Sequence, residues 1–447
     1  MLKRKIQKFI EHYLSSHSNK MLVIDGARQI GKSYIIREVG SRLFPNFVEV
    51  NLAKDKNGQK IFAEANTVEK FLFQLSTVAG DKMHDKSDTL VFLDEIQAYP
   101  HMLTLVKFLK EDDRFTYIAS GSQLGVTLRQ TVSIPVGSME IKHMYQLDFE
   151  EFLWANGFDE TAVEELRKRF MAGESLEENL HKRMLDLFKR YLLIGGMPDA
   201  VNEYLKSRNI VSVRKIQEDI SRLYELDASQ YDNKHKLKIS SVYKMIPSTM
   251  ENKKKRLVYK DIEGKDKRWK DYADEIDYLT SSGISLSVRA ISSPCFPLVE
   301  SASKNLIKLY LNDVGLLTNI LYRYNVAAVL DDVLSVNLGS VYESVVASEL
   351  RAHGHDLFYY DNKTKGEVDY IVDDYETLSV LPIEVKSGKD YQIHHALNSF
   401  AANEEYKIKK GIVLSNDREV FSKGIITYMP IYYVMFLEYK VPEEVII

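Results

Sequence analysis

The chain has 447 residues, of which 45% are hydrophobic and 28% are charged, and its formal net charge is −4. This composition is typical of globular proteins with several domains, and it excludes a disordered chain and a uniformly basic nucleic-acid binder. The single cysteine, Cys295, excludes a disulfide framework and predicts a cytoplasmic protein. Because the longest apolar run, residues 429–437, is too short to span a bilayer, we expect no membrane partner.

The first motif along the chain predicts a nucleotide site. Residues 26–33 read Gly-Ala-Arg-Gln-Ile-Gly-Lys-Ser, the G-x-x-x-x-G-K-[ST] signature of a phosphate-binding P-loop. An apolar run at 21–24 predicts a strand before it, and helical spacing at 33–39 predicts a helix after it. In such a loop the backbone N–H groups face phosphate oxygens, the lysine reaches the β- and γ-phosphates, and the serine binds Mg²⁺. The alternative is a glycine-rich turn with an ordinary surface lysine.

The predicted nucleotide-binding residues share this loop, its first helical turn and one later strand end. They are Gly26, Ala27, Arg28, Gln29, Ile30, Gly31, Lys32, Ser33, Tyr34 and Ser122. Lys32 is also predicted to act in catalysis, and Ser33 to be a metal ligand.

A second motif predicts hydrolysis. Residues 89–95 read as an apolar strand that ends in two acids, at the edge where open α/β sheets bind ligands. We predict that Asp94 is a Mg²⁺ ligand and that Glu95 orients or deprotonates the attacking water. The alternative is a pair of acids that complements the dipole of the next helix.

A third strand is expected at 115–119, followed by Ser-Gly-Ser-Gln. Ser122 is the candidate sensor of the γ-phosphate, and Gln123 is the second choice. Ordinary loop chemistry explains the same residues equally well.

Periodicity divides the rest of the chain. Strands and helices alternate over 1–155, which predicts a three-layer α/β domain. Helical spacing over 156–230 predicts a helical lid, with a helix at 180–193 that ends at Gly-Gly-Met-Pro (195–198). Residues 231–300 read as helix, basic link, helix and strand, the order of a winged helix, and 301–447 read as a second α/β domain.

The predicted winged helix is basic. Between residues 234 and 270 the chain holds thirteen Lys or Arg against four Asp or Glu. A basic face of this kind binds a DNA backbone, so DNA is the expected partner. The alternative is a solvated surface.

The C-terminal third carries a second set of chemical residues. Two strands are expected at 366–372 and 381–387, and pairing them brings Asp369, Glu384 and Lys386 together. Two carboxylates can hold Mg²⁺, and a lysine can position a metal-bound water, which is the PD-(D/E)xK nuclease core in outline. Glu343, on a helix expected at 341–350, completes the acid set. Glu384 and Lys386 are the predicted catalytic residues, and Glu343, Asp369 and Glu384 the predicted metal ligands. The alternative is a pair of strands with an exposed Glu–Lys pair.

Five motifs in order resemble one family. They are the P-loop, Leu-Asp-Glu-Ile-Gln at 93–97, Gly-Gly-Met-Pro at 195–198, Lys-Leu-Tyr-Leu-Asn-Asp-Val-Gly-Leu-Leu at 308–317, and Glu-Val-Lys-Ser-Gly at 384–388. The chain resembles, over nearly its whole length, prokaryotic AAA-type P-loop ATPases fused to a C-terminal domain with a restriction-endonuclease-like core. The resemblance implies an AAA-type core that uses ATP and Mg, a winged helix and a nuclease-like domain.

One departure from this family concerns an arginine. Members often carry Gly-Arg shortly before a Pro-Leu-Ser-Phe-x-Glu-Phe stretch, whereas residues 136–138 here read Val-Gly-Ser. Arg129 and Arg28 are therefore the candidate cations for the nucleotide site.

Together these features predict an ATPase that couples its nucleotide state to DNA binding or processing, with ATP or ADP as ligand and a homo-oligomer as the expected assembly. The first alternative is an ATP-gated, metal-dependent DNA nuclease. The second is an ATP-switched platform for protein interaction, with an inactive nuclease-like domain.

Overall fold

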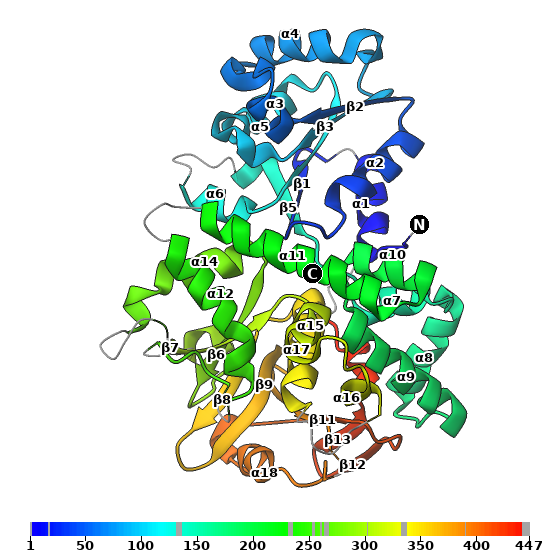
Figure 1. Ribbon diagram of the computed structural model, residues 1–447, viewed down its shortest axis with the longest axis vertical. Helices are drawn as coiled ribbons and strands as arrows, with labels where there is room; N and C mark the ends of the chain where they lie inside the picture. Colours follow the sequence, from blue (N-terminus) through cyan, green and yellow to red (C-terminus); the bar gives the residue numbers. More distant parts are fainter. Residues whose placement is uncertain are drawn as a thin grey trace. The chain divides into compact units, whose positions relative to one another are not determined.

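The computed structural model describes residues 2–16, 18–130, 136–230, 236–252, 255–259, 262, 268–301, 303–331, 338–388 and 390–439 (Figure 1). The chain forms two compact units. The first consists of Lys3–Gln146 with the short segment Ser281–Ile284, and the second of Leu147–Thr280 with Ser285–Ile447.

The first unit is built on a five-stranded parallel sheet. The strand order is β2 (Asn46–Asn51), β3 (Thr89–Asp94), β4 (Thr116–Gly121), β1 (Met21–Asp25) and β5 (Met139–His143). Every residue of β1 and β3 is buried, as expected for apolar strands in the middle of a parallel sheet. The predicted strands at 21–24, 89–95 and 115–119 are thus present, and their carboxyl ends lie at one edge.

Helices connect the strands of this unit. They are α1 (Lys5–Ser15), α2 (Lys32–Leu43), α3 (Leu52–Asn57), α4 (Val68–Ala79), α5 (Pro100–Asp112) and α6 (Leu124–Gln130). The α2 helix begins at the P-loop lysine, and α4 and α5 bury their apolar faces in the same core as β3 and β4. The arrangement confirms an α/β domain with a parallel-sheet core.

The second unit begins with helices. They are α7 (Phe149–Ala155), α8 (Glu160–Ala172), α9 (Glu178–Ile194), α10 (Pro198–Ser207), α11 (Ile210–Gln230), α12 (Lys236–Met250) and α14 (Ala273–Ser281). The helices expected from residue 148 and over 180–193 correspond to α7 and α9. A capping box starts α7, because Asp148 accepts from the Glu151 N–H and Glu151 accepts from the Asp148 N–H.

An eight-stranded mixed sheet forms the other half of the second unit. Its order is β12 (Phe421–Lys423), β13 (Ile426–Pro430), β11 (Gly411–Ser415), β10 (Ser379–Lys386), β9 (Gly366–Asp374), β8 (Phe358–Asn362), β6 (Ser285–Ile291) and β7 (Ser303–Leu311). The accompanying helices are α15 (Val314–Tyr322), α16 (Ala327–Leu330), α17 (Gly339–Ala352) and α18 (His395–Ala401). The α17 helix packs on β10 and β7.

The strand predicted as a wing has a different place. Residues 284–291 correspond to β6, which pairs antiparallel with β7 and parallel with β8. Both edges of β6 are therefore used inside the C-terminal sheet. The winged helix predicted over 231–300 differs from this arrangement, since its strand is an internal strand of a sheet that continues beyond residue 301.

Two motifs of the family resemblance meet inside the second unit. Asp313, at the N-cap of α15, accepts from the Gly196 N–H at 2.6 Å and from the Leu316 N–H at 3.1 Å. Gln217 donates to the carbonyls that end α9, Leu193 at 3.0 Å and Ile194 at 2.9 Å. Burial raises the pKa of Asp313 to about 6, although the backbone N–H donors oppose the shift. The motifs at 195–198 and 308–317 thus join α9 to α15.

No helix in the described part of the chain is both long and apolar enough to cross a membrane. The apolar run at 429–437 instead falls in β13 and a buried 3₁₀ helix, Ile431–Phe436.

Candidate functional site

The P-loop adopts the turns that its glycines predict. Gly26 has φ +145° and Gly31 has φ +92°, and Gln29 between them also lies in the left-handed region at φ 64°. A side chain at Gly26 would collide with the Met144 carbonyl oxygen. The loop is therefore held by its neighbours in a shape that depends on glycine at position 26.

Lys32 lies inside this loop. Its side chain is buried, and Nζ donates to the carbonyl oxygens of Gly26 at 2.9 Å and Ala27 at 2.7 Å. Burial lowers the pKa of Lys32, while the nearby carboxylates of Glu95, Asp25 and Asp94 oppose that shift. These acids favour the ammonium form, which is the form that attracts phosphate.

Asp94, at the end of β3, joins the P-loop serine to the two neighbouring strands, β2 and β4. Its Oδ1 accepts from Ser33 Oγ at 2.8 Å and from Ser120 Oγ, and its Oδ2 accepts from Asn51 Nδ2 at 2.8 Å. The carboxylate is thus fixed next to the hydroxyl with which it is predicted to share a magnesium ion. Asn51 and Ser120 were missed in the sequence analysis; the available signal was a polar residue at the carboxyl end of β2 and of β4.

Glu95 follows in an unusual backbone conformation. Its φ of 55° lies in the left-handed region, which non-glycine residues adopt rarely. Its Oε2 accepts from Ser122 Oγ at 2.6 Å, from the Ser122 N–H at 3.2 Å and from Gln97 Nε2. Glu95 is therefore held in one orientation by β4 and by its own turn.

Ser122 links Glu95 to the P-loop. It is buried, and its Oγ accepts from Arg28 Nε at 3.5 Å while it donates to Glu95. This position, between the P-loop and the Walker-B acid, is compatible with the predicted response to a γ-phosphate. Gln123 lies in the turn before α6, with φ 65°.

The remaining predicted residues of this site are also placed. Ala27 and Ile30 are buried within the loop, and Tyr34 is 55% exposed on the first turn of α2. The Arg129 side chain lies outside the described residues. Ser138 ends a 3₁₀ helix, Val136–Ser138, directly before β5.

These residues fit ATP with magnesium. The loop and Lys32 would hold the phosphates, and Ser33 with Asp94 would hold the cation. When bound, the cation would neutralise phosphate charge. Glu95 is the group available to accept a proton from water.

The C-terminal acids do come together. The β9 and β10 strands pair antiparallel, and Asp369 Oδ2 accepts from the Val385 N–H at 2.8 Å. Lys386 Nζ lies 2.7 Å from Glu384 Oε1. Burial, and next the nearby Glu384, raise the pKa of Asp369 well above its ordinary value. Burial likewise raises the pKa of Glu384, against the opposing effect of Lys386.

Glu343 completes the acid set, but it is already surrounded by donors. On buried α17, its Oε1 pairs with Lys255 Nζ, and its Oε2 accepts from Tyr310 OH at 3.2 Å and lies 3.8 Å from Lys308 Nζ. Burial alone would raise the pKa of Glu343, but the two lysines outweigh it, so the net pKa is lowered. Across the residues that the structure describes, no group of three His, Cys, Asp or Glu could hold a metal ion. The predicted metal ligands Glu343, Asp369 and Glu384 thus lie near one another without forming a cation site.

The two described residues of the basic link predicted to contact DNA, Lys255 and Arg256, face acids of the second unit. Lys255 pairs with Glu343, and Arg256 Nη2 lies 2.5 Å from Asp361 and 3.2 Å from Glu367. Lys253 and Lys254 lie outside the described residues. The charges of Lys255 and Arg256 are therefore satisfied within the second unit.

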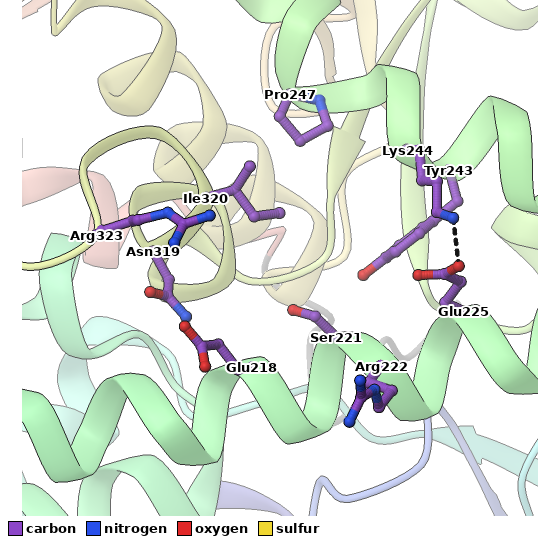
Figure 2. A pocket seen from close by; sticks show the side chains of 10 residues that line it. All are labelled: Glu218, Ser221, Arg222, Glu225, Tyr243, Lys244, Pro247, Asn319, Ile320 and Arg323. Carbon is purple, nitrogen blue, oxygen red and sulfur yellow. Dashed lines mark ion pairs between the residues drawn. The ribbon is translucent and has the colours of Figure 1, made fainter.

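A pocket of about 330 Å³ lies between α11, α12 and α15 (Figure 2). Glu225 pairs with Lys244 at 2.5 Å on one wall, and Pro247 and Ile320 supply apolar surface. The lining carries charges of both signs, so the pocket selects for neither anions nor cations. Its residues are Glu218, Ser221, Arg222, Glu225, Tyr243, Lys244, Pro247, Asn319, Ile320 and Arg323.

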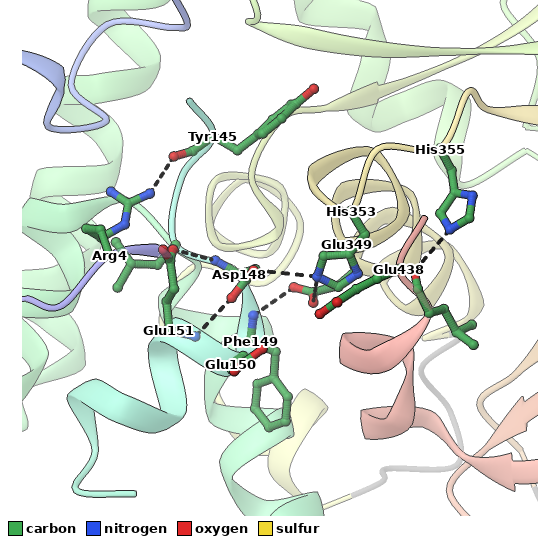
Figure 3. A network of polar contacts seen from close by, with 12 residues as sticks. Arg4, Tyr145, Asp148, Phe149, Glu150, Glu151, Glu349, His353, His355 and Glu438 are labelled. Carbon is green, nitrogen blue, oxygen red and sulfur yellow. Dashed lines mark hydrogen bonds and ion pairs between the residues drawn. The ribbon is translucent and has the colours of Figure 1, made fainter. Parts of the chain in front are cut away.

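A polar network anchors the start of α7 to α17 (Figure 3). The Phe149 N–H donates to Glu349 Oε1 at 2.8 Å, and the same oxygen accepts from Tyr191 OH at 3.3 Å. His353 Nε2 lies 3.5 Å from Asp148 and 3.8 Å from Glu349. Since all these side chains are buried, the network fixes helix positions rather than forming a solvent-accessible site.

Three parts of the chain match known protein families. Residues 18–153 match a family described as an AAA domain. Residues 185–325 and 338–434 match two families, each described as a domain of unknown function (DUF8612 and DUF4143). No curated protein matches the chain. Residues 18–153, which include most of the first unit, are therefore similar to AAA domains. The first family of unknown function spans both motifs that meet at Asp313.

Several solved structures are similar to this chain. A Walker-type ATPase of Pyrococcus abyssi is 13% identical with a TM-score of 0.44, over 71% of this chain and 95% of that one. Hsp104 of S. cerevisiae, in its ADP complex, is 14% identical with a TM-score of 0.29, over 63% of this chain and 38% of that one. PCH-2 of C. elegans is 12% identical with a TM-score of 0.24, over 41% and 52%. At these TM-scores the likenesses carry no argument about the activity of this chain.

Proposed function

We propose that the chain hydrolyses ATP with magnesium at the P-loop of its first unit. The observation that carries this proposal is the 2.8 Å contact between Ser33 and Asp94, with Glu95 as the next residue. In the proposed reaction, Lys32 balances phosphate charge, Ser33 and Asp94 hold the cation, and Glu95 accepts the proton of the attacking water. The hydrogen bonds from Ser122 and Gln97 keep Glu95 oriented for that step.

The test is phosphate release by purified protein with ATP and Mg²⁺. We expect Lys32→Ala to lose both nucleotide binding and turnover. Glu95→Gln should keep nucleotide binding but lose roughly 10²–10⁴-fold in turnover, because the amide cannot take a proton. Lys107→Ala and Glu111→Gln are matched controls, since these two residues form an exposed pair on α5. Turnover that survives in both site variants would disprove the assignment.

We also propose that the second unit is a platform whose interactions follow the nucleotide state, with a nuclease-like fold that does not cleave DNA. Support for the fold comes from β9 and β10, which pair as that core requires and carry Asp369 and Glu384. Support for an inactive site comes from Glu343, whose two oxygens face Lys255, Tyr310 and Lys308.

DNA remains a proposed partner of this platform, and a DNA-binding titration over a range of salt concentrations tests it. A contact with the phosphate backbone gives a steep fall of log affinity with log salt, whereas a protein partner gives no DNA binding. Because Lys255 and Arg256 are paired internally, we expect Arg256→Ala not to reduce that slope.

We also propose that the chain forms a homo-oligomer and that it works in the cytoplasm. Self-association is supported by the AAA-type domain, and light scattering with and without ATP measures it. A reducing cytosol is supported by the one cysteine of the sequence, Cys295, which is exposed as a free thiol.

A further inference from the structure

Lys308 is a fully buried cation at the centre of the C-terminal acids. Its side chain, on β7, is 0% exposed, and Nζ lies 2.6 Å from Glu367 Oε1 and 3.8 Å from Glu343 Oε2. The same ammonium lies 4.6 Å from the centre of the Tyr359 ring. A buried lysine is costly unless acids and a ring face surround it, so these contacts explain why the charge is tolerated.

Most of the acid oxygens that a metal would need are already engaged, and Glu384 Oε2 is the buried oxygen of the set that has no hydrogen-bond partner among the described residues. Glu343 faces Lys255 with one oxygen, and Tyr310 and Lys308 with the other. Asp369 accepts a backbone N–H, and Glu384 pairs with Lys386 at 2.7 Å. A hard divalent cation requires several free oxygen ligands, and here it would also be repelled by nearby ammonium groups.

The charges of the cluster are nearly balanced by protein groups. Five acids face four cations, and each cation makes at least one ion pair with an acid of the set. The acids are Glu343, Asp361, Glu367, Asp369 and Glu384, and the cations are Lys255, Arg256, Lys308 and Lys386. Four of the five acids are therefore paired with a cation of the protein, and Asp369 is the one acid in excess.

We propose that Lys308 is an internal counter-ion in the place of a divalent cation, so that the acid cluster of the second unit is closed without a metal. This inference rests on the proposed platform and gives its physical reason. It also assigns a role to the motif at 308–317: Lys308 and Tyr310 point to the same glutamate, Glu343, from alternate positions of one strand.

The test is a titration of the full-length chain with Mn²⁺ in the absence of nucleotide. Electron paramagnetic resonance measures the concentration of free Mn²⁺, and bound Mn²⁺ is the remainder. Asp94→Asn serves as the background, because it removes the predicted metal ligand of the first unit. In that background we expect no Mn²⁺ binding that depends on Glu384. Lys308→Met, which keeps the length of the side chain but removes its charge, should gain one Mn²⁺ site at least about tenfold tighter than the background. Adding Glu384→Gln should remove that site again.

Lys410→Met is the matched control, because Lys410 pairs with Asp374 of the same unit at 3.1 Å, away from the cluster. It should gain no Mn²⁺ site. Two results would overturn the proposal: Mn²⁺ binding with Lys308 intact that Glu384→Gln abolishes, or a folded Lys308→Met chain that gains no site. If Lys308→Met does not fold, Mn²⁺ binding is compared between Asp94→Asn and the double variant Asp94→Asn with Glu384→Gln. Equal binding by these two chains supports the proposal, and weaker binding by the double variant overturns it.

The outcome is separable from that of the ATPase proposal. Failure of the ATPase would appear as unchanged turnover in Lys32→Ala and Glu95→Gln, with the Mn²⁺ titrations unaffected. Cleavage of plasmid DNA by the wild-type chain with Mn²⁺, lost in Glu384→Ala, would contradict both the platform and the role of Lys308.

Discussion

Single side chains at the carboxyl ends of β2, β3 and β4 determine the geometry of the nucleotide site. Asn51, Ser120 and Ser33 converge on Asp94, and Ser122 converges on Glu95. Each donor leaves its acid in one orientation, which reduces the reorganisation needed when water is activated.

Ser122→Ala tests this role of a single hydroxyl. We expect turnover to fall roughly tenfold while ATP affinity changes little, because a hydrogen bond to a charged group contributes about 1.5–3 kcal/mol and the backbone donor at Ser122 persists. Steady-state turnover and nucleotide titration measure the two effects. Ser76→Ala, at an exposed serine on α4, should behave as wild type. A rise in KM without a fall in kcat would contradict the role.

At this scale the sequence predicted the motif residues and missed their supports. Lys32, Ser33 and Asp94 stand in patterns that only one chemistry explains well. Asn51 and Ser120 are single polar residues after apolar strands, and nothing in their own neighbourhood distinguishes them from ordinary strand ends. Only the order β2, β3, β4 brings them to Asp94.

Among the elements, the junction of α9 with α15 depends on close backbone approach. Gly195 has φ +72°, and a side chain there would collide with the Asp313 carboxylate. Gly173, at the end of α8, has φ +67° and ψ 32°, in the left-handed helical region, and no atom of the described residues lies within 4 Å of an added Cβ. Gly195 has ψ −167°, a conformation found essentially only in glycine, so the two positions differ in both crowding and backbone strain.

We predict that Gly195→Ala lowers the free energy of unfolding by more than about 3 kcal/mol, since it adds a collision to the cost of an alanine in a backbone conformation that favours glycine. Gly173→Ala should cost only about 1 kcal/mol. Urea unfolding followed by circular dichroism measures both. Equal losses at the two positions would contradict the greater cost expected at Gly195.

The buried carboxylate at this junction makes stability depend on pH. The pKa of Asp313 is about 6 in the folded chain against an ordinary value of 3.8. The folded state therefore holds the proton more tightly, and this contribution to stability is complete below pH 3.8 and is lost as the pH rises through 6.

Accordingly, the difference in unfolding free energy between wild type and Asp313→Asn should shift by about 2 kcal/mol against wild type from pH 4 to pH 7. Urea unfolding of both chains at the two pH values gives this difference, in which other titrating groups cancel. A constant difference would refute a raised pKa for Asp313.

Hydrophobic periodicity predicts single helices and strands but not how distant strands pair. It predicted α9, α12, β9 and β10 from their own residues. It could not predict that β6 pairs with β8, because pairing partners far apart in sequence leave no local pattern. The winged helix over 231–300 therefore stays a prediction, with β6 paired on both sides inside the larger sheet.

For the whole molecule, the sheet order sets which fragments can fold. We predict that a fragment of residues 147–447 is monomeric and folded, since it holds nearly all of the second unit. A fragment of residues 301–447 lacks β6 and should aggregate, because the edges of β7 and β8 are then unpaired. Size-exclusion chromatography and circular dichroism compare the two, and a folded 301–447 fragment would contradict the sheet order.

For the C-terminal acids, the sequence predicted which acids gather but not which cations surround them. Glu343, Asp369, Glu384 and Lys386 were predicted to gather, and they do. Lys308 and Lys255 come from separate segments, and each is an ordinary lysine in its local sequence. What the acids can do is decided by those cations, so the chemistry of this cluster could be read only from the fold.

The position of β6 also has a consequence for how the chain is made. On the ribosome, residues 285–291 emerge well before 358–362, and β6 cannot complete its pairing until β8 has appeared. At synthesis rates of about 5–20 residues per second, the wait is roughly 4 to 14 s. During that interval β7 can pair with one edge of β6 while the other edge stays open. Nascent chains that stall there would be the ones that bind chaperones.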